Sequence, residues 1–230
     1  MKHFVVFLFL AAALAPAQRR PTVPAMRILI EAEENYCTCA MSSLEAEASV
    51  RVEASSPRGR TAQSFGIAAY FLPANQFRIE RKGTDWRIEL NNGAEAAEFG
   101  PGGLRNRASA PARWTESFRP GDFPGSHWLI YDALTAGARN VRIKGEEILT
   151  VEGRPVACFV IEFDRDLQQS GAVTGHATVW IGKKEKYVYQ EVSSLAGVRR
   201  TVRITKLNLE TPPEELLFDA GRVEPAPPAR

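Results

Sequence analysis

Several features that would assign a chemistry are scarce or missing in this 230-residue sequence. It has three cysteines, three histidines and a formal net charge of only +2. It contains no Gly-x-Ser-x-Gly elbow, no Gly-rich phosphate loop and no His-Glu-x-x-His, the signatures of serine hydrolases, nucleotide-binding enzymes and zinc hydrolases. We therefore predict that the protein is not an enzyme and has no catalytic residue, no cofactor and no metal site. A net charge of +2 is too small to indicate a surface that neutralises many phosphates, so we expect no nucleic-acid partner.

The few cysteines leave thiol chemistry open. Cys37 and Cys39 stand two residues apart and Cys158 is distant, which is compatible with one disulfide and one free thiol. A Cys-x-Cys pair also suits a soft metal, but neither His127 nor His176 has a partner at ligand spacing. A redox thiol at Cys37 or Cys39 is the enzymatic alternative.

No apolar run is long enough to cross a bilayer, which takes about 20 residues. The run that begins at Phe4 ends before Pro16, and this disfavours an N-terminal membrane anchor. It follows a basic start and is followed by small residues at Ala15 and Ala17, the pattern of a secretory signal peptide. We predict cleavage between Ala17 and Gln18 and export from the cytoplasm.

Hydrophobic periodicity predicts a helix followed by two sets of strands. Apolar residues at steps of three and four predict a helix from Pro24 to Tyr36, and strict alternation from Leu44 to Ala54 predicts a strand. Further strands are predicted over 62–72, 76–82, 86–91, 95–99, 141–151, 156–164, 177–181, 187–192 and 198–207. Between the two sets we expect a surface loop over 100–125 and a helix over 127–136, and a turn over 212–218 closes the chain.

This order predicts an α+β fold, in which a curved antiparallel sheet buries one face under helices. Residues 18–223 form a single domain in this interpretation, with a disordered tail over 224–230. Small inward residues such as Ala46 and Ala48 oppose large ones on later strands, an arrangement that can leave an apolar cavity, although alternating apolar residues more often fill a core. The candidate cavity residues are Val50, Val52, Phe65, Ile67, Phe71, Phe77, Ile79, Trp86, Ile88, Ile130 and Leu134.

Three stretches of the chain carry a family resemblance. The first is Leu72 to Gly83, LPANQFRIERKG, followed by Trp86 and Asn91-Asn92-Gly93. The second runs through VEGRPVACFVIEF, residues 151–163, to TVWIGKK, residues 178–184, and the third is PPEELLF, residues 212–218. In order and spacing they resemble the LolA/LolB-like superfamily of outer-membrane lipoprotein carriers.

The resemblance implies an incomplete, strongly curved antiparallel β-barrel, with helices as a lid over a hydrophobic cavity. It implies a periplasmic carrier of lipoprotein acyl chains or other lipids, which encounters membranes only peripherally and has envelope membrane proteins as further candidate partners. The superfamily also contains regulators similar to MucB/RseB, so the alternative is an envelope-stress sensing or protein-interaction module. The Cys37–Cys39 pair and the Arg-rich 100–125 stretch depart from the family pattern.

Overall fold

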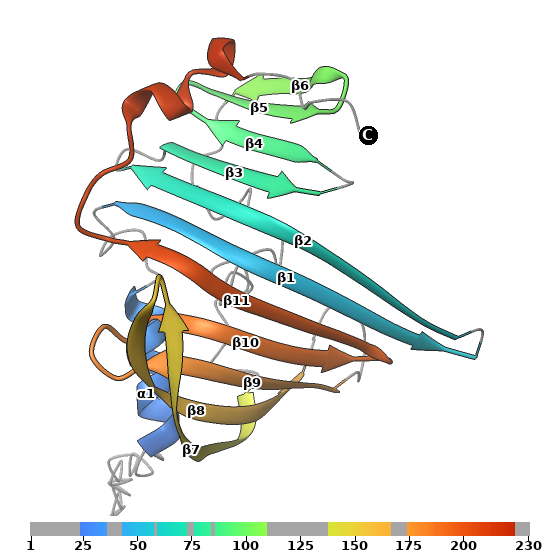
Figure 1. Ribbon diagram of the computed structural model, residues 1–230, viewed down its shortest axis with the longest axis vertical. Helices are drawn as coiled ribbons and strands as arrows, with labels where there is room; N and C mark the ends of the chain where they lie inside the picture. The colour runs from blue at the N-terminus through green and yellow to red at the C-terminus, as the bar shows by residue number, and fades with distance from the viewer. Residues whose placement is uncertain are drawn as a thin grey trace, which may run out of the picture.

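A computed structural model of the chain consists mainly of one long antiparallel sheet (Figure 1). The structure describes residues 24–35, 43–57, 59–72, 76–83, 86–109, 138–166 and 174–223. Several predictions concern residues outside these ranges: the signal peptide with its cleavage between Ala17 and Gln18, the thiols of Cys37 and Cys39, the helix over 127–136 with Ile130 and Leu134, and the tail over 224–230.

The described chain has one α-helix, two short 3-10 helices and eleven strands in a single sheet. The strands lie in the order β6-β5-β4-β3-β2-β1-β11-β10-β9-β8-β7, so β6 and β7 stand at its two ends. The elements are α1 (Pro24–Asn35), β1 (Leu44–Ser56), β2 (Gly59–Leu72), β3 (Gln76–Lys82), β4 (Arg87–Asn91), β5 (Glu95–Gly100), β6 (Gly103–Ser109), β7 (Ala138–Val151), β8 (Arg154–Asp166), β9 (Thr174–Gly182), β10 (Val188–Leu195), β11 (Val198–Asn208), η3 (Glu215–Phe218) and η4 (Ala220–Arg222).

The predicted first helix and the predicted strands are present, with boundaries that shift by up to three residues. One expectation was wrong: the loop over 100–125 contains a strand, since Gly103–Ser109 pairs with β5 as β6. Its side chains are mostly exposed, so no alternation of apolar residues marks it. The strand forms because the backbone edge of β5 supplies hydrogen-bond partners whatever the side chains are.

The helix α1 packs by one narrow apolar side. Pro24 occupies its first position, where the missing N–H costs nothing. Ala25, Leu29 and Ala32, at steps of four and three, are almost completely buried, while the opposite side carries an exposed pair in which Arg27 Nε lies 3.1 Å from Glu31 Oε1. With 12 residues, α1 is too short to cross a bilayer, and no other helix in the described ranges has the necessary length and apolarity.

The sheet is open and its two halves differ in curvature (Figure 1). We call β7–β11 the curled half and β1–β6 the extended half. In the curled half the turn after β7 reaches back to β11, where the backbone N–H of Glu152 donates to the carbonyl oxygen of Thr205 at 3.3 Å. The open, curved sheet therefore fits the incomplete antiparallel barrel that the family resemblance implied.

Tight turns join neighbouring strands where the sequence favours them. Asn92-Gly93 joins β4 to β5, with φ of 91° at Gly93 and with the Asn92 Oδ1 accepting from the N–H of Glu95 at 2.9 Å. Glu152-Gly153 and Ala196-Gly197 are two-residue turns in which both residues have positive φ. Such turns match the twist of a hairpin.

Two apolar clusters lie on opposite faces of the sheet. The larger one joins α1 to the strands of the curled half and to β1–β3, and it includes Leu29, Val50 and Ile79. The smaller consists of Ile88, Leu90, Ala97, Phe99 and Ala220. The pairing of β3 with β4 shows which residues share a face. Ile79 is opposite Glu89, and Ile88 is opposite Glu80. Since Ile88 and Glu89 are adjacent in the chain and so point to opposite faces, Ile79 and Ile88 lie on different faces of the sheet. We call the side of the larger cluster the inner face and the other side the outer face.

Candidate functional site

The candidate site is the apolar inner face where β1, β2 and β3 run side by side. Cross-strand pairing brings Val50 opposite Phe65 and Phe71 opposite Phe77. The predicted cavity residues that share this face are Val50, Val52, Phe65, Ile67, Phe71, Phe77 and Ile79. The structure thus brings seven of the predicted residues into one continuous apolar surface.

Small and large side chains alternate across this face as the sequence predicted. Ala48 is opposite Ile67, and Ala69 is opposite Ile79. Ile67 is 3% exposed and Ile79 is 8% exposed, so both side chains are packed. Beside them lies a hollow of about 20 Å³, which is room for roughly one water molecule.

A charged border limits the apolar face on the side of β4 and β5. The hollow beside Ile67 and Ile79 is also lined by Arg81, Arg87 and Glu89. Arg87 forms an ion pair with Glu89, and its Nε lies 3.6 Å from Glu98 Oε1. These side chains are mostly withdrawn from solvent, where charge–charge interactions are stronger than at an open surface.

Arg81 connects the charged border to the apolar face. Its guanidinium carbon lies 3.9 Å from the centroid of the Phe65 ring, within the range of a cation–π contact. The apolar face therefore ends at an aromatic ring covered by a cation, and a ligand on this face would meet apolar groups first and charged groups at the border.

Asn91 adds a buried amide to the same border. It is 0% exposed, and its Oδ1 accepts a hydrogen bond from the N–H of Gly93 at 2.8 Å. Its Nδ2 meets no acceptor in the part of the chain that the structure describes. A buried donor of this kind is costly unless water or a ligand satisfies it.

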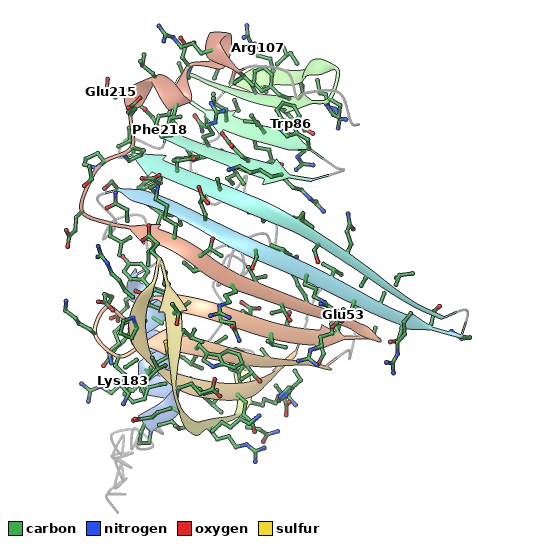
Figure 2. All side chains as sticks on the ribbon, in the orientation of Figure 1. Glu53, Trp86, Arg107, Lys183, Glu215 and Phe218 are labelled. Atoms are coloured by element: carbon green, nitrogen blue, oxygen red, sulfur yellow. The ribbon has the colours of Figure 1, made fainter. Side chains whose placement is uncertain are left out.

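Two of the predicted cavity residues do not belong to the inner face. Ile88 is a member of the smaller cluster on the outer face, and Trp86 packs against that cluster. Figure 2 shows Trp86 at the end of the molecule near the C-terminal 3-10 helices, far from the position of α1 in Figure 1. The prediction that they line the same surface as Ile79 was wrong, because the register of β3 and β4 turns them to the other side.

The sequence interpretation missed the charged border, although one signal for it was present. Arg81 continues the alternation of Phe77 and Ile79 along β3, so its position on the inner face can be read from a period of two. Glu89 carries no such signal. Its place opposite Ile79 follows only from the pairing of β3 with β4.

The one described cysteine lies away from this border. Cys158 is a free thiol with 0% exposure. Burial, helped by the charges of Glu185 and Glu147, raises the pKa of the Cys158 thiol to about 11. The neutral thiol is a poor nucleophile, so Cys158 behaves as a small apolar residue of the core.

The chain matches no known protein-family profile, and no curated protein is significantly similar to it in sequence. Several solved structures are similar in fold. LprF from Mycobacterium bovis has a TM-score of 0.48 and 11% identity, with 82% of this chain and 96% of that chain covered. A LolA superfamily protein from Nitrosomonas europaea has a TM-score of 0.39 and 12% identity, with 86% and 98% covered.

The complex of MucA and MucB from Pseudomonas aeruginosa is similar as well, with a TM-score of 0.43, 14% identity, and 86% of this chain and 61% of that chain covered. The superfamily that the sequence resembles thus appears among similar solved structures. With TM-scores under 0.5 and identities under 15%, these likenesses carry no ligand and no partner over to this chain.

Proposed function

We propose that this protein is an exported, non-catalytic carrier that holds the acyl chains of a lipoprotein or another lipid against the inner face of its sheet. The observation that carries the proposal is the continuous apolar surface that Val50, Phe65, Ile67, Phe77 and Ile79 form across three strands. The N-terminal sequence, which has the pattern of a signal peptide, supports a periplasmic location.

The chemistry of the face suits an acyl chain better than a polar ligand. Each methylene group removed from water contributes about 0.8 kcal/mol, and apolar surface lines this face from β1 to β3. The charged border of Arg81, Arg87 and Glu89 supplies polar groups where a chain would join its headgroup. Apolar pockets with a few polar groups at one side are typical of small-molecule sites.

Entry of a chain requires the packed face to open, because the hollow at Ile67 and Ile79 has only about 20 Å³. The helix α1 belongs to the same cluster through Ala25, Leu29 and Ala32. It contributes few large side chains, so its displacement exposes less apolar surface than the loss of a strand would. In this proposal α1, which contacts β7 of the curled half, is the movable cover, and an acyl chain that extends along the cluster into the curled half replaces its contacts.

Native mass spectrometry of the mature protein, purified gently and then extracted under denaturing conditions, tests the proposal. We expect a stoichiometric species that bears acyl chains. Ile79→Thr should weaken its retention about tenfold, because a hydroxyl without a partner in an apolar site costs about 1–3 kcal/mol.

Ile88→Thr is the matched control, since it makes the same change at a buried isoleucine of the neighbouring strand on the outer face. It should retain lipid like the unchanged protein. Phe65→Ser, at a half-buried position, repeats the test if Ile79→Thr does not fold. Equal retention by Ile79→Thr and Ile88→Thr would place the lipid elsewhere.

A mass without ligand, even after incubation with phospholipid or lipoprotein, would contradict the carrier proposal. It would favour the alternative of a protein-interaction module in an envelope sensor. The small size of the hollow beside Ile79 is the observation that favours this alternative, because a core packed this tightly needs no ligand.

A further inference from the structure

A second hollow lies on the outer face of the sheet, opposite the apolar surface. It is a groove of about 680 Å³ over the middle of the sheet, within the range of small-molecule sites, which is about 300–1,000 Å³. Its lining combines the polar residues Glu47, Ser49, Arg51, Ser64, Lys82, Gln190, Thr201, Arg203 and Thr205 with Ala48, Val50, Phe65, Gly66 and Ile67. The carrier proposal uses none of the polar residues.

Strand register arranges these residues in rows. Ser49 of β1 is opposite Arg203 of β11 on one side and Gly66 of β2 on the other. Gly66 is in turn opposite Lys82 of β3. One row therefore carries a cation at each end and two small residues between them. Since neighbouring strands are about 4.8 Å apart, the backbones of Arg203 and Lys82 are roughly 14 Å apart.

The next row on the same face adds a third cation and two hydroxyl groups. Arg51 is opposite Thr201 on β11 and Ser64 on β2. Its guanidinium contacts Glu53 at 2.8 Å, and the Arg51 side chain remains 61% exposed. Hydroxyl groups beside cations supply the several donors that a phosphate group with its three free oxygens requires.

The groove has a surplus of positive charge. Its acidic lining residue, Glu47, is opposite Lys206 on β11. The pKa of Lys206 is raised by its hydrogen bond to Glu45 and further by the charges of Glu45 and Glu47. The Lys206 ammonium hydrogen-bonds Glu45 and acts on Glu47 only through its charge. Arg51 is paired with Glu53, and Arg203 Nη2 donates to the carbonyl oxygen of Thr150 at 3.4 Å. Lys82 and Arg203 are therefore the lining cations that would attract an anion most strongly.

Gly66 keeps the floor of the groove open. A glycine inside a strand costs about 0.5–1 kcal/mol relative to alanine and often marks a close approach by a ligand. A Cβ at this position would meet only the Lys82 Cβ at 3.7 Å and the Ala48 carbonyl oxygen at 4.0 Å. Packing alone therefore does not require glycine at this position. A larger side chain would fit, but it would fill the floor of the groove.

We propose that the outer groove binds a ligand carrying two phosphate groups, one held near Arg203 and the other near Lys82, with Ser49 and Gly66 beneath the part between them. Arg51 lies beside the middle of the ligand and neutralises either phosphate. The ligand is the headgroup of a lipid with two phosphates or a soluble bisphosphate, since both present the same groups to these side chains.

Binding is measured with fructose bisphosphate by titration calorimetry and with phosphatidylcholine vesicles, with or without cardiolipin, by flotation. We expect the unchanged protein to bind fructose bisphosphate or the cardiolipin vesicles, and the probe that binds identifies the source. Lys82→Ala and Arg203→Ala should each weaken binding on the order of tenfold. Gly66→Val should abolish it without lowering the melting temperature, because the side chain fills the groove and favours a strand.

Lys184→Ala and Arg27→Ala are the controls, since they remove the same charges at side chains that are 91% and 78% exposed outside the groove. Both should bind like the unchanged protein. Failure of the unchanged protein to bind either probe, undiminished binding by Gly66→Val, or equal losses in the control variants would each overturn the proposal. The Ile79→Thr variant separates it from the carrier proposal, because that change lies on the inner face and should leave bisphosphate binding unaltered.

Discussion

The curled and extended halves of the sheet are built from the same kind of hairpin, yet only one of them curls. Register shifts interrupt the β7–β8 pair twice, between Arg139 and Arg142 and between Ile143 and Gly145, and they also interrupt β9–β10 and β1–β11. In the extended half, the described pairs from β1 to β5 run without a shift, and one occurs between β5 and β6. A bulge adds a residue to one strand and increases the local twist, so curvature follows the irregularities.

The difference in curvature decides where each half buries its apolar side chains. The curled half closes over its own interior and shares one cluster with α1. Beyond β3, the extended half buries apolar groups on the outer face, where Ala220 of η4 belongs to the same cluster as Ile88 and Phe99. The carbonyl oxygen of Leu217 also accepts a hydrogen bond from Arg78 Nη1 at 2.8 Å. A flat sheet has two sides to cover, and the C-terminal segment covers the second.

The largest expected effect is a difference in stability between variants of the two apolar clusters. Phe163→Ala, in the large cluster, should lower the free energy of unfolding by about 3–5 kcal/mol, because it leaves a cavity where the structure cannot collapse. Phe99→Ala, in the small cluster at the end of the sheet, should cost less because its surroundings relax more easily. Denaturant unfolding of both variants measures the difference, and equal losses would mean that the two halves are equally well packed.

A smaller effect is expected at two strand glycines. A Cβ on Gly182 of the curled half would lie 2.6 Å from Cε2 of the buried Tyr189 ring, so Gly182→Ala should cost about 1–3 kcal/mol. Gly66→Ala in the extended half meets only ordinary contacts and should stabilise by about 0.5–1 kcal/mol. Thermal unfolding of both variants shows whether each substitution lowers or raises the stability of the protein. A loss of stability at Gly66 would show that the outer groove is narrower than described.

The smallest effect concerns pH and the edge of the curled half. Hydrogen bonds from Asn140 and His176 lower the pKa of the Asp164 carboxyl. A lowered pKa in the folded state stabilises the protein at pH values above the ordinary pKa of a carboxyl group. This contribution is lost as the pH falls through the pKa of the folded state. Asn140→Ala should therefore destabilise slightly at neutral pH, by less than about 1 kcal/mol for so exposed a pair.

Unfolding of the Asn140→Ala variant at neutral pH and at a pH below about 3 makes the comparison, since the unperturbed pKa of Asp is near 3.9. The difference from the unchanged protein should shrink on acidification. A difference that is constant with pH would assign the effect to the backbone of Asn140, whose φ is +55°, rather than to the carboxylate.

Much of the fold could be predicted from local pattern. Alternation from Leu44 to Ala54 marks β1 because successive side chains of a strand point to opposite faces, and the spacing of Ala25, Leu29 and Ala32 marks the buried side of α1. No local pattern predicted β6, since its exposed side chains follow no period. That strand exists because β5 offers it a backbone edge.

The candidate site likewise has a part that the sequence predicted and a part that only strand pairing decides. Val50, Phe65, Ile67 and Ile79 share a face as alternation along each strand suggested. Trp86 and Ile88 do not, since the register between β3 and β4 sets their side. The outer groove could not be predicted from the sequence, because it depends on the pairing of four strands. These pairings form the row of Arg203, Ser49, Gly66 and Lys82.

The sequence by itself therefore determined which segments of this protein are strands and which residues within one strand share a side, because the period of two is a property of the extended backbone. The tertiary structure decided which sides of different strands face together, how far the sheet curls, and that Lys82 and Arg203 border one groove. Those features depend on pairing between strands distant in sequence, where a shift of one residue moves every side chain to the other face.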